Sequence, residues 1–288
     1  QLAVVRAATG VLNATLDGSA VLVGSKEDYE AGAGSSEKFI ARTAGADGNN
    51  LHVVIVDRGP DFTIVKSGHG LSVGGTYTDN AAVGHEVVEV VDANTFRIIQ
   101  GTAAPTPAAG DTSTAFTVSD WNSTAIGSTG LTYKEVGPRP GTSAFASERY
   151  VSYDEVHVAV VDTSSNTIVE RMTYLSKISD AKSPEGSSIY WKDYVNEFSG
   201  YIYAGALTSA EFTTLGEDPG GAVASYGATS AAPIKIARIL KTAGGALSGG
   251  TDDYAYTTGE IVAAYTQFQD TEETVSYTHL TLPTRKLV

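Results

Sequence analysis

Two apolar runs, far apart in the chain, constrain its fold more than any other feature. Residues 51–56 form a continuous apolar run with one histidine, a pattern typical of a strand buried on both faces. Residues 156–161 give the strongest strand signal in the sequence, and a polar turn at 162–166 follows them. Residues 168–174 can return from that turn as a hairpin partner. We expect these strands to belong to one domain, the host domain of the chain.

The sequence between the two runs has a different residue pattern. Short stretches that alternate apolar and polar residues are separated by turns rich in Gly, Asn and Asp, and they cover residues 62–65, 75–78, 86–91 and 95–99. A stretch rich in Thr, Ala and Pro follows at 102–114, with further β-like sequence to Tyr133. We predict that residues 61–132 form a small all-β insertion that lies between two strands of the host domain and faces outward.

Helical spacing follows in two places. One apolar stripe precedes Gly200 and predicts a helix with a buried face, formed by Tyr190, Trp191, Tyr194, Val195 and Phe198. A capping box at 257–260 opens a second helix, whose expected inward-facing residues are Ile261, Val262, Tyr265 and Phe268. Near the start of the chain, residues 12–15 and 18–23 read as a strand, a turn and a strand.

Together these elements predict a mixed α+β, multidomain fold, with a layered strand–helix host domain and a small all-β insertion. The host domain comprises residues 1–60 and 133–276. Residues 277–288, YTHLTLPTRKLV, continue neither helical nor strand periodicity, and we interpret them as a non-native tail. The opening QLAVVRA has no methionine, and we interpret the chain as a fragment of a longer polypeptide.

Charge and cysteine content narrow the classes of function. The formal net charge is -14, which disfavours binding to nucleic acid or to an anionic membrane, because both require surfaces rich in Lys and Arg. No apolar run approaches the roughly 20 residues that span a bilayer, so we expect no membrane insertion. The chain has no cysteine, which excludes disulfides and thiol catalysis and fits assembly in a reducing cytoplasm.

The histidines offer the only arrangement that suggests a metal. His69 and His85 lie in Gly-flanked turns of the predicted insertion, with acidic residues nearby at Asp79, Glu86 and Asp92. Sequence separation fixes no geometry, so we interpret both as ordinary turn histidines and expect no bound metal.

Two other histidines, His52 and His157, lie within the apolar runs and are expected to be packed strand residues, while His279 belongs to the interpreted tail.

Two pairs of adjacent carboxylates could be taken for general acid–base dyads, namely Asp154–Glu155 and Asp252–Asp253. Sequence neighbours on a strand point to opposite sides, so we interpret both pairs as solvated ends of elements. Motifs for serine nucleophiles, metalloproteases, calcium-binding loops and phosphate-binding loops are absent from the sequence. We therefore expect no enzymatic activity, no catalytic residue and no cofactor.

Two segments of the chain carry family-like motifs. Residues 39–51 read FIARTAGADGNNL, which fits aromatic-x-A-[RK]-x-x-G-x-x-G-[ND]-x-[LI]. Residues 154–162 read DEVHVAVVD, and residues 175–202 read LSKISDAKSPEGSSIYWKDYVNEFSGYI. Together they resemble the middle region of the contractile-tail sheath proteins of T-even-like tailed phages, in which a strand precedes an SKxSDAK and GSSxYYKDxIN block.

The resemblance implies a structural role in the virion. Sheath subunits polymerise as helical rings around the tail tube, are assembled in the bacterial cytoplasm, and contract to drive the tube through the bacterial envelope. The implied partners are neighbouring sheath subunits, the tail tube protein, and the baseplate and tail terminator proteins. The alternative is a phage tail adhesin or glycan-binding β module that works through residues 61–132. A tail-associated hydrolase is a third, weaker interpretation.

Overall fold

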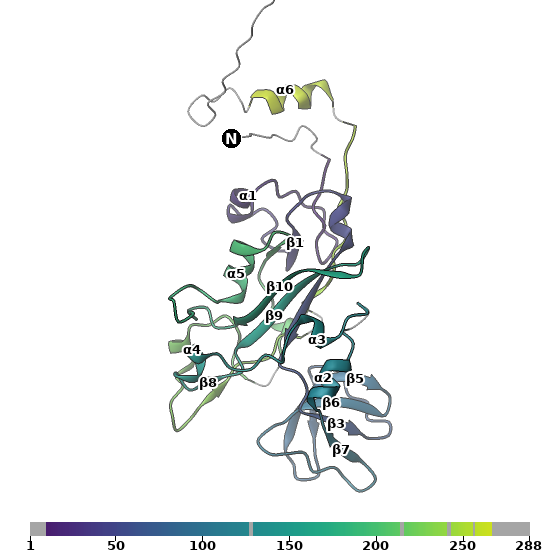
Figure 1. The fold of residues 1–288 in the computed structure, drawn as a ribbon, viewed down its shortest axis with the longest axis vertical. Helices are drawn as coiled ribbons and strands as arrows, with labels where there is room; N and C mark the ends of the chain where they lie inside the picture. The colour runs from purple at the N-terminus through teal and green to yellow at the C-terminus, as the bar shows by residue number, and fades with distance from the viewer. Residues whose placement is uncertain (1–9, 127–128, 214–215, 241–242, 256, 267–288) are drawn as a thin grey trace, which may run out of the picture.

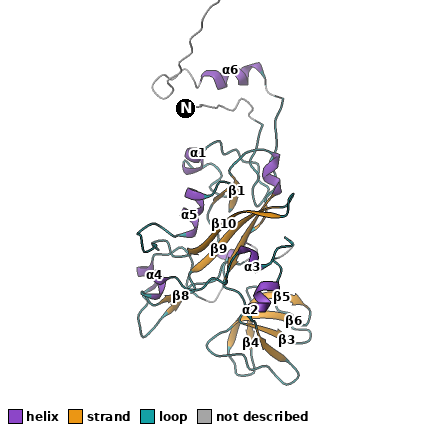
Figure 2. Cartoon of the chain, in the orientation of Figure 1, coloured by secondary structure: helices purple, strands orange, loops and turns teal. Residues whose placement is uncertain are grey.

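A computed structural model describes residues 10–126, 129–213, 216–240, 243–255 and 257–266 of the chain. These residues form helices and several separate sheets, so the fold is of the mixed α+β class (Figure 2). The amino-terminal residues 1–9 and the predicted tail at 277–288 lie outside the described residues.

A four-stranded antiparallel sheet lies at the centre of the molecule (Figure 1). Its strand order is β10 (Thr167–Ser176), β9 (Glu155–Asp162), β2 (Leu51–Asp57) and β13 (Gly245–Ala246). The predicted strands at 51–56 and 156–161 are confirmed, and so is the hairpin that pairs β9 with β10. These two apolar runs pair directly, with Val54 opposite Ala159.

Both faces of this sheet are covered, as the unbroken apolar sequence of its strands requires. Val53 and Ile55 of β2 pack on one face, in a core that includes Phe39, Trp191 and Val195. Successive side chains of a strand point to opposite faces. Val54 and Val56 therefore pack on the other face, in a core formed with Trp121, Ile126, Leu131, Val136, Ala159 and Val161.

Helix α5 (Trp191–Phe198) covers the first face, close to a two-stranded sheet of β1 (Phe39–Ala41) and β11 (Ile202–Ala204). Trp191 and Val195 are buried one turn apart, as the apolar stripe predicted. The prediction is wrong for Phe198, which is 64% exposed. Phe198 lies in the last turn of the helix, where its ring packs on that of Tyr194 instead of entering the core. The two ring centres are 4.6 Å apart.

A second, five-stranded antiparallel sheet projects from the central one, at the lower right of Figure 1. Its strand order is β4 (Thr76–Thr78), β5 (Gly84–Asp92), β6 (Thr95–Ile99), β3 (Phe62–Val65) and β7 (Thr112–Ala115). It has a small core of its own, formed by Ile64, Tyr77, Val87, Phe96 and Ile98. We call residues 62–115 the insertion from here on.

The insertion ends earlier than the boundary predicted at residue 132. The expected β-like sequence after β7 instead forms helices α2 (Val118–Ser123) and α3 (Tyr133–Val136). Capping boxes at Thr117–Asp120 and Thr132–Glu135 begin these helices. Their buried residues, Trp121 among them, pack on the central sheet, so this segment belongs to the host domain.

Shorter elements complete the host domain. They are α1 (Lys26–Glu30), the 3-10 turns η1 (Ala46–Asn50), η2 (Ser209–Glu211) and η3 (Val223–Tyr226), α4 (Ala144–Ser147), and the parallel pair β8 (Val151–Ser152) and β12 (Ile234–Lys235). The strand–turn–strand predicted at 12–23 is reduced to an isolated bridge between Asn13 and Val21. Leu12 and Thr15 form isolated bridges with other parts of the chain, at Thr251, Ile40 and Ser248. The buried Asn13 side chain bonds to the backbone of Val23 and Ala41, taking the place of a regular ladder.

Helix α6 (Thr258–Thr266) begins at the predicted capping box, since the Thr257 hydroxyl and the Glu260 carboxylate bond reciprocally to backbone amides. It lies apart from the central sheet and from the five-stranded sheet of the insertion (Figure 1). The expectation of an inward apolar face is wrong for Val262 and Tyr265, which are 57% and 68% exposed. Phe268 lies outside the described residues.

The ends of the insertion meet, because the Phe116 amide donates to the Asp61 carbonyl at 2.8 Å. We predict that replacing residues 62–115 with about four Gly and Ser residues leaves the host domain folded, since so short a loop closes at little entropic cost. The variant should also carry Arg238→Met, because Arg238 pairs with Glu86 of the insertion.

Urea unfolding followed by fluorescence of Trp121 and Trp191 measures the outcome. Cooperative unfolding is expected for the deletion variant. As a control, Phe39→Ala in the intact chain should cost about 3–5 kcal/mol, because Phe39 is fully buried in the host core. A deletion variant without a cooperative transition would show that the host domain depends on the insertion.

Candidate functional site

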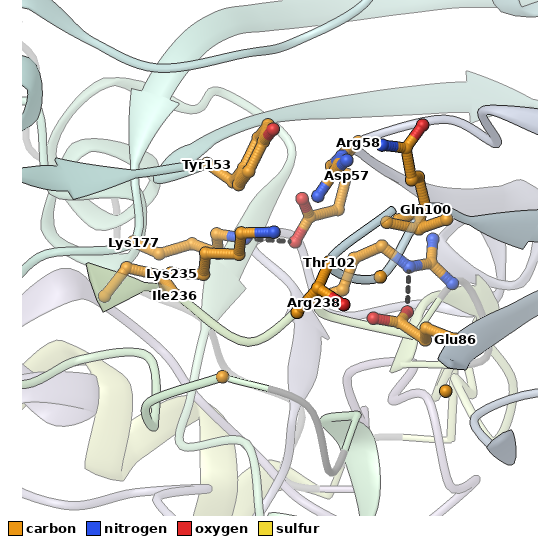
Figure 3. Close-up of a pocket in the computed structure, with 14 residues that line it drawn as sticks. Asp57, Arg58, Glu86, Gln100, Thr102, Tyr153, Lys177, Lys235, Ile236 and Arg238 are labelled. Atoms are coloured by element: carbon orange, nitrogen blue, oxygen red, sulfur yellow. Dashed lines mark hydrogen bonds and ion pairs between the residues drawn. The ribbon is translucent and has the colours of Figure 1, made fainter. Parts of the chain in front are cut away.

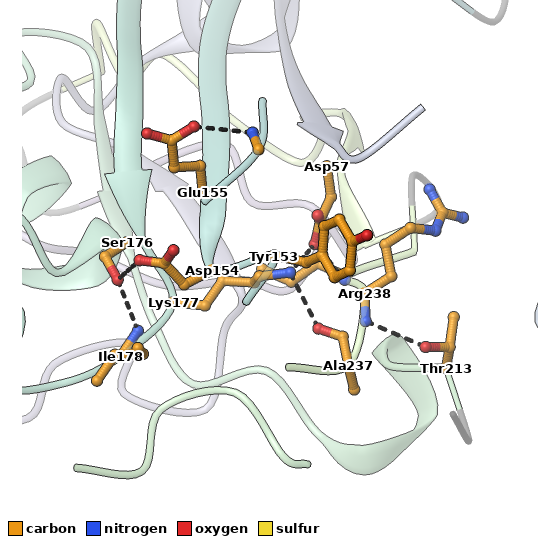
Figure 4. Close-up of polar contacts among 12 residues, drawn as sticks. Asp57, Tyr153, Asp154, Glu155, Ser176, Lys177, Ile178, Thr213, Ala237 and Arg238 are labelled. Carbon is orange, nitrogen blue, oxygen red and sulfur yellow. Dashed lines mark hydrogen bonds and ion pairs between the residues drawn. The ribbon is translucent and has the colours of Figure 1, made fainter. Parts of the chain in front are cut away.

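The most unusual feature of the interior is a fully buried ion pair between Lys177 and Asp57 (Figure 4). Asp57 ends strand β2, and Lys177 directly follows strand β10. The ammonium lies 2.6 Å from the Asp57 carboxylate and also donates to the Ala237 carbonyl at 3.0 Å. The same carboxylate oxygen accepts the Ile239 amide at 2.7 Å. The pair therefore joins three segments that are distant in the sequence.

A second buried ion pair lies beside the first and connects the insertion to the host domain. Arg238 donates from Nε to the Glu86 carboxylate at 2.9 Å, and both side chains are less than 10% exposed (Figure 3). Glu86 lies on strand β5 of the insertion. Arg238 lies between the two residues whose backbone bonds to the first pair, so segment 237–239 contacts both pairs.

Burial shifts the pKa values of Lys177 and Glu86 in the directions that favour their neutral forms. Burial lowers the pKa of Lys177, and the charge of Asp57 opposes that effect. Burial raises the pKa of Glu86, and the charge of Arg238 opposes it. Among the described residues, the Asp57 Oδ1 and Arg238 Nη2 atoms are buried without a hydrogen-bond partner. Each charge is therefore retained inside the protein mainly by its partner, and backbone groups of Ala237 and Ile239 add to the inner pair.

A cavity of about 300 Å³ opens next to the two pairs, between the insertion and the host domain (Figure 3). Asp57, Glu86, Lys177 and Arg238 all line it. The insertion contributes Glu86, Gln100 and Thr102 to its lining (Figure 3). The arrangement places several charged groups in a concave, partly apolar space, which is the usual character of a ligand site.

A separate polar cluster surrounds Asp154, which the sequence predicted to be solvated. That prediction is wrong, because Asp154 is fully buried. Its carboxylate accepts the Ser143 amide and hydroxyl, both at 2.8 Å. It also accepts the Ser176 hydroxyl at 2.5 Å (Figure 4). These donors replace the water that Asp154 loses on folding. Its neighbour Glu155 is half-buried and accepts the Gly141 amide, so the two carboxylates form no dyad.

Among the described residues, no histidine contacts the serines at Asp154. His157 is buried on β9, as predicted, and backbone groups occupy both of its ring nitrogens. Its Nε2 donates to the Pro138 carbonyl at 2.7 Å, and its Nδ1 accepts the Tyr174 amide at 3.0 Å. The ring is therefore held neutral, and burial lowers its pKa. His52, on β2, is half-buried, and burial lowers its pKa as well.

The insertion does not bring the candidate metal ligands into one site. His85 is a fully buried strand residue and not the turn residue that we predicted; its Nε2 faces Asp79 at 3.4 Å. His69 bonds instead to the Asp92 carbonyl, and Glu86 pairs with Arg238. Three backbone amides, with that of Thr106 foremost, and the His85 side chain lower the pKa of Asp79 to about 2. No group of three or more metal-ligating side chains occurs in the described part of the chain.

The second carboxylate pair, Asp252 and Asp253, lies near the surface, and each side chain accepts a hydrogen bond from a backbone amide. Asp252 is exposed and accepts the Ala46 amide at 2.9 Å, while Asp253 accepts the Gly10 amide at 3.0 Å. His279 lies outside the described residues.

The two buried ion pairs were not predicted from the sequence. A signal for one was present, since Asp57 ends an apolar run and Lys177 directly follows the end of strand β10. Neither position reveals its partner, because 120 residues separate them.

The chain matches no protein-family model and no curated protein. None of the described helices is long and apolar enough to cross a membrane.

We predict that Lys177→Met and Asp57→Asn each lower the free energy of unfolding by about 3–5 kcal/mol, because each leaves a buried charge without its partner. The double variant should lose less than the sum of the two, since it removes both charges. Urea unfolding of the four proteins measures the coupling. Glu148→Gln is the control, because the Glu148–Arg149 pair is exposed and should change stability by less than about 1 kcal/mol. Strict additivity would contradict a direct interaction.

Stability should also depend on pH through His157. Its pKa in the folded state lies below the usual 6.5, so below that pH the unfolded chain binds a proton that the folded chain does not. Stability is therefore expected to fall as the pH drops from about 7 to 5. His157→Gln should reduce the slope of unfolding free energy against pH in this range. An unchanged slope in that variant would assign the effect to other groups.

Proposed function

We propose that this chain is part of a structural subunit of a phage contractile tail sheath. The observation that supports the proposal is that the two motif-bearing segments, residues 39–51 and 154–202, associate closely in the fold. Strand β1 of the first pairs with strand β11 at the end of the second, with Ala41 opposite Ile202. Arg42, the basic letter of the first motif, donates to the Ile202 carbonyl. Two motifs that are distant in sequence thus form one structural unit.

A further observation concerns the SKISDAK letters of the second motif. Ser176 bonds to Asp154, Lys177 forms the buried ion pair with Asp57, and Ile178 is fully buried. Each of these three residues therefore stabilises the interior of the host domain. In a sheath the motif would therefore preserve the subunit as a rigid body while the contacts between subunits change.

The proposed mechanism needs no cofactor and no enzymatic step. Sheath contraction requires two packings of the same subunits that differ in free energy, and the difference is stored in the interfaces between subunits. The partners would be neighbouring copies of the subunit, the tail tube protein, and the baseplate and tail terminator proteins. The insertion, which projects from the host domain, would lie on the outer surface of the assembled tail (Figure 1).

Electron microscopy of the complete open reading frame, expressed alone, tests the proposal. We expect striated hollow tubes. The same protein without residues 62–115, and with Arg238→Met, should still form tubes, of smaller outer diameter, because the insertion would lie outside the polymer.

Dispersed monomers or small closed oligomers, across salt and protein concentrations, would contradict a sheath. Saturable binding of glycans through the insertion would then favour the alternative, a tail adhesin or glycan-binding module. Tubes of unchanged diameter in the deletion variant would support the sheath and contradict the outward placement of the insertion.

A further inference from the structure

The cavity beside the buried ion pairs continues into a second, more open hollow of about 550 Å³. The two hollows share six lining residues, namely Arg58, Gln100, Gly101, Thr102, Tyr153 and Lys235. They therefore form one continuous cleft between the insertion and the host domain. Its inner part lies against Lys177 and Arg238, and its outer part lies against Arg58, Arg139 and Lys235.

The cleft is basic, although the whole chain carries a formal net charge of -14. Five cationic side chains line it, and only three carboxylates do. Each of the three carboxylates already forms an ion pair with at least one of these cationic side chains. Asp57 pairs with Lys177, Glu86 pairs with Arg238, and Asp61 accepts from both Arg58 and Arg139. Positive charge is therefore left over in a hollow with low-dielectric walls, where it acts strongly on an entering ion.

Two of the cationic side chains have donors to spare. Arg238 is only 7% exposed, and its Nη2 atom has no hydrogen-bond partner among the described residues. Lys235 is exposed at the mouth of the cleft and forms no ion pair with any residue that the structure describes; its ammonium lies 5.6 Å from the ring centre of Tyr153. A ligand that accepts hydrogen bonds would supply what these groups lack.

Tyr153 gives an independent reason to regard the cleft as a built site. Its φ of 61° places a bulky residue in the left-handed region, which is strained for any residue with a large side chain. The Arg58 guanidinium packs over the ring at 3.6 Å from its centre, in addition to the Lys235 contact. Strained residues of this kind are concentrated at binding sites. Here the strain places an aromatic ring where it positions two cations at the mouth.

We propose that this cleft is an anion-binding site, which takes a compact oxyanion with two or more negative charges. Phosphate, pyrophosphate and small polycarboxylates share that chemistry: several acceptor oxygens on a small, multiply charged group. Lys235 and Arg58 would receive the ion at the mouth, and the free donor of Arg238 would attract it inward. The site is independent of the assembly role proposed above, because all of its lining residues belong to a single chain.

Isothermal titration of the whole chain with sodium pyrophosphate and, separately, with sodium citrate tests the site, with chloride added to keep ionic strength constant. We expect saturable binding of at least one of them with a stoichiometry of one. Lys235→Gln should weaken the binding at least about tenfold, the usual effect of losing one charge-assisted hydrogen bond. Lys235 is exposed, so this variant should keep the melting temperature of the unaltered chain.

Lys192→Gln is the matched control, since it removes the same charge from helix α5, outside the cleft. It should bind as the unaltered chain does. Binding of citrate but not pyrophosphate would assign the site to polycarboxylates, and the reverse would assign it to phosphates. No saturable heat with either ion, or equal weakening by the two lysine variants, would overturn the proposal.

Discussion

The Lys177 ammonium and the Asp57 carboxylate meet where the central sheet, segment 237–239 and the insertion converge. Removing either charge from water is costly, so neither can be buried unless the other arrives at hydrogen-bond distance. That requirement fixes the ends of strands β2 and β10 relative to each other. It also places the backbone of segment 237–239, which bonds to both partners. The packing of both sheet faces has to be compatible with this one contact.

The same segment connects the insertion to the host domain. Arg238 reaches across to Glu86 on β5, while its neighbours Ala237 and Ile239 bond to the inner ion pair. The insertion is thus linked to the host domain by charge as well as by its two chain connections. A force applied to the insertion would reach the central sheet through these contacts. For a subunit of a contracting polymer, that linkage would favour motion as one body; for a ligand site, it holds the two walls of the cleft together.

Hydrophobic patterning predicted the elements well where both faces of a strand are buried. Strands β2 and β9 follow from their short apolar runs, because the short length and the many β-branched residues favour a strand buried on both faces over a buried helix. Patterning failed where burial is one-sided. Phe198 has the spacing of a core residue and is exposed, because it lies in the last turn of its helix. The segment after β7 has β-like composition but forms helices, since its capping boxes and the nearby sheet face outweigh propensity.

The amino-acid sequence by itself determined the fold class, the strands of the central sheet and the existence of a β-rich insertion, because these depend on local periodicity and turn chemistry. Only the tertiary structure decided which polar residues are buried. Asp154 and Lys177 are charged residues next to strands, where solvation is the default, and His85 follows a glycine that reads as a turn. Their burial depends on donors and acceptors supplied by segments far away in the chain, and no local pattern encodes those partners. The cleft and its excess of positive charge arise in the same way, from residues that only the fold brings together.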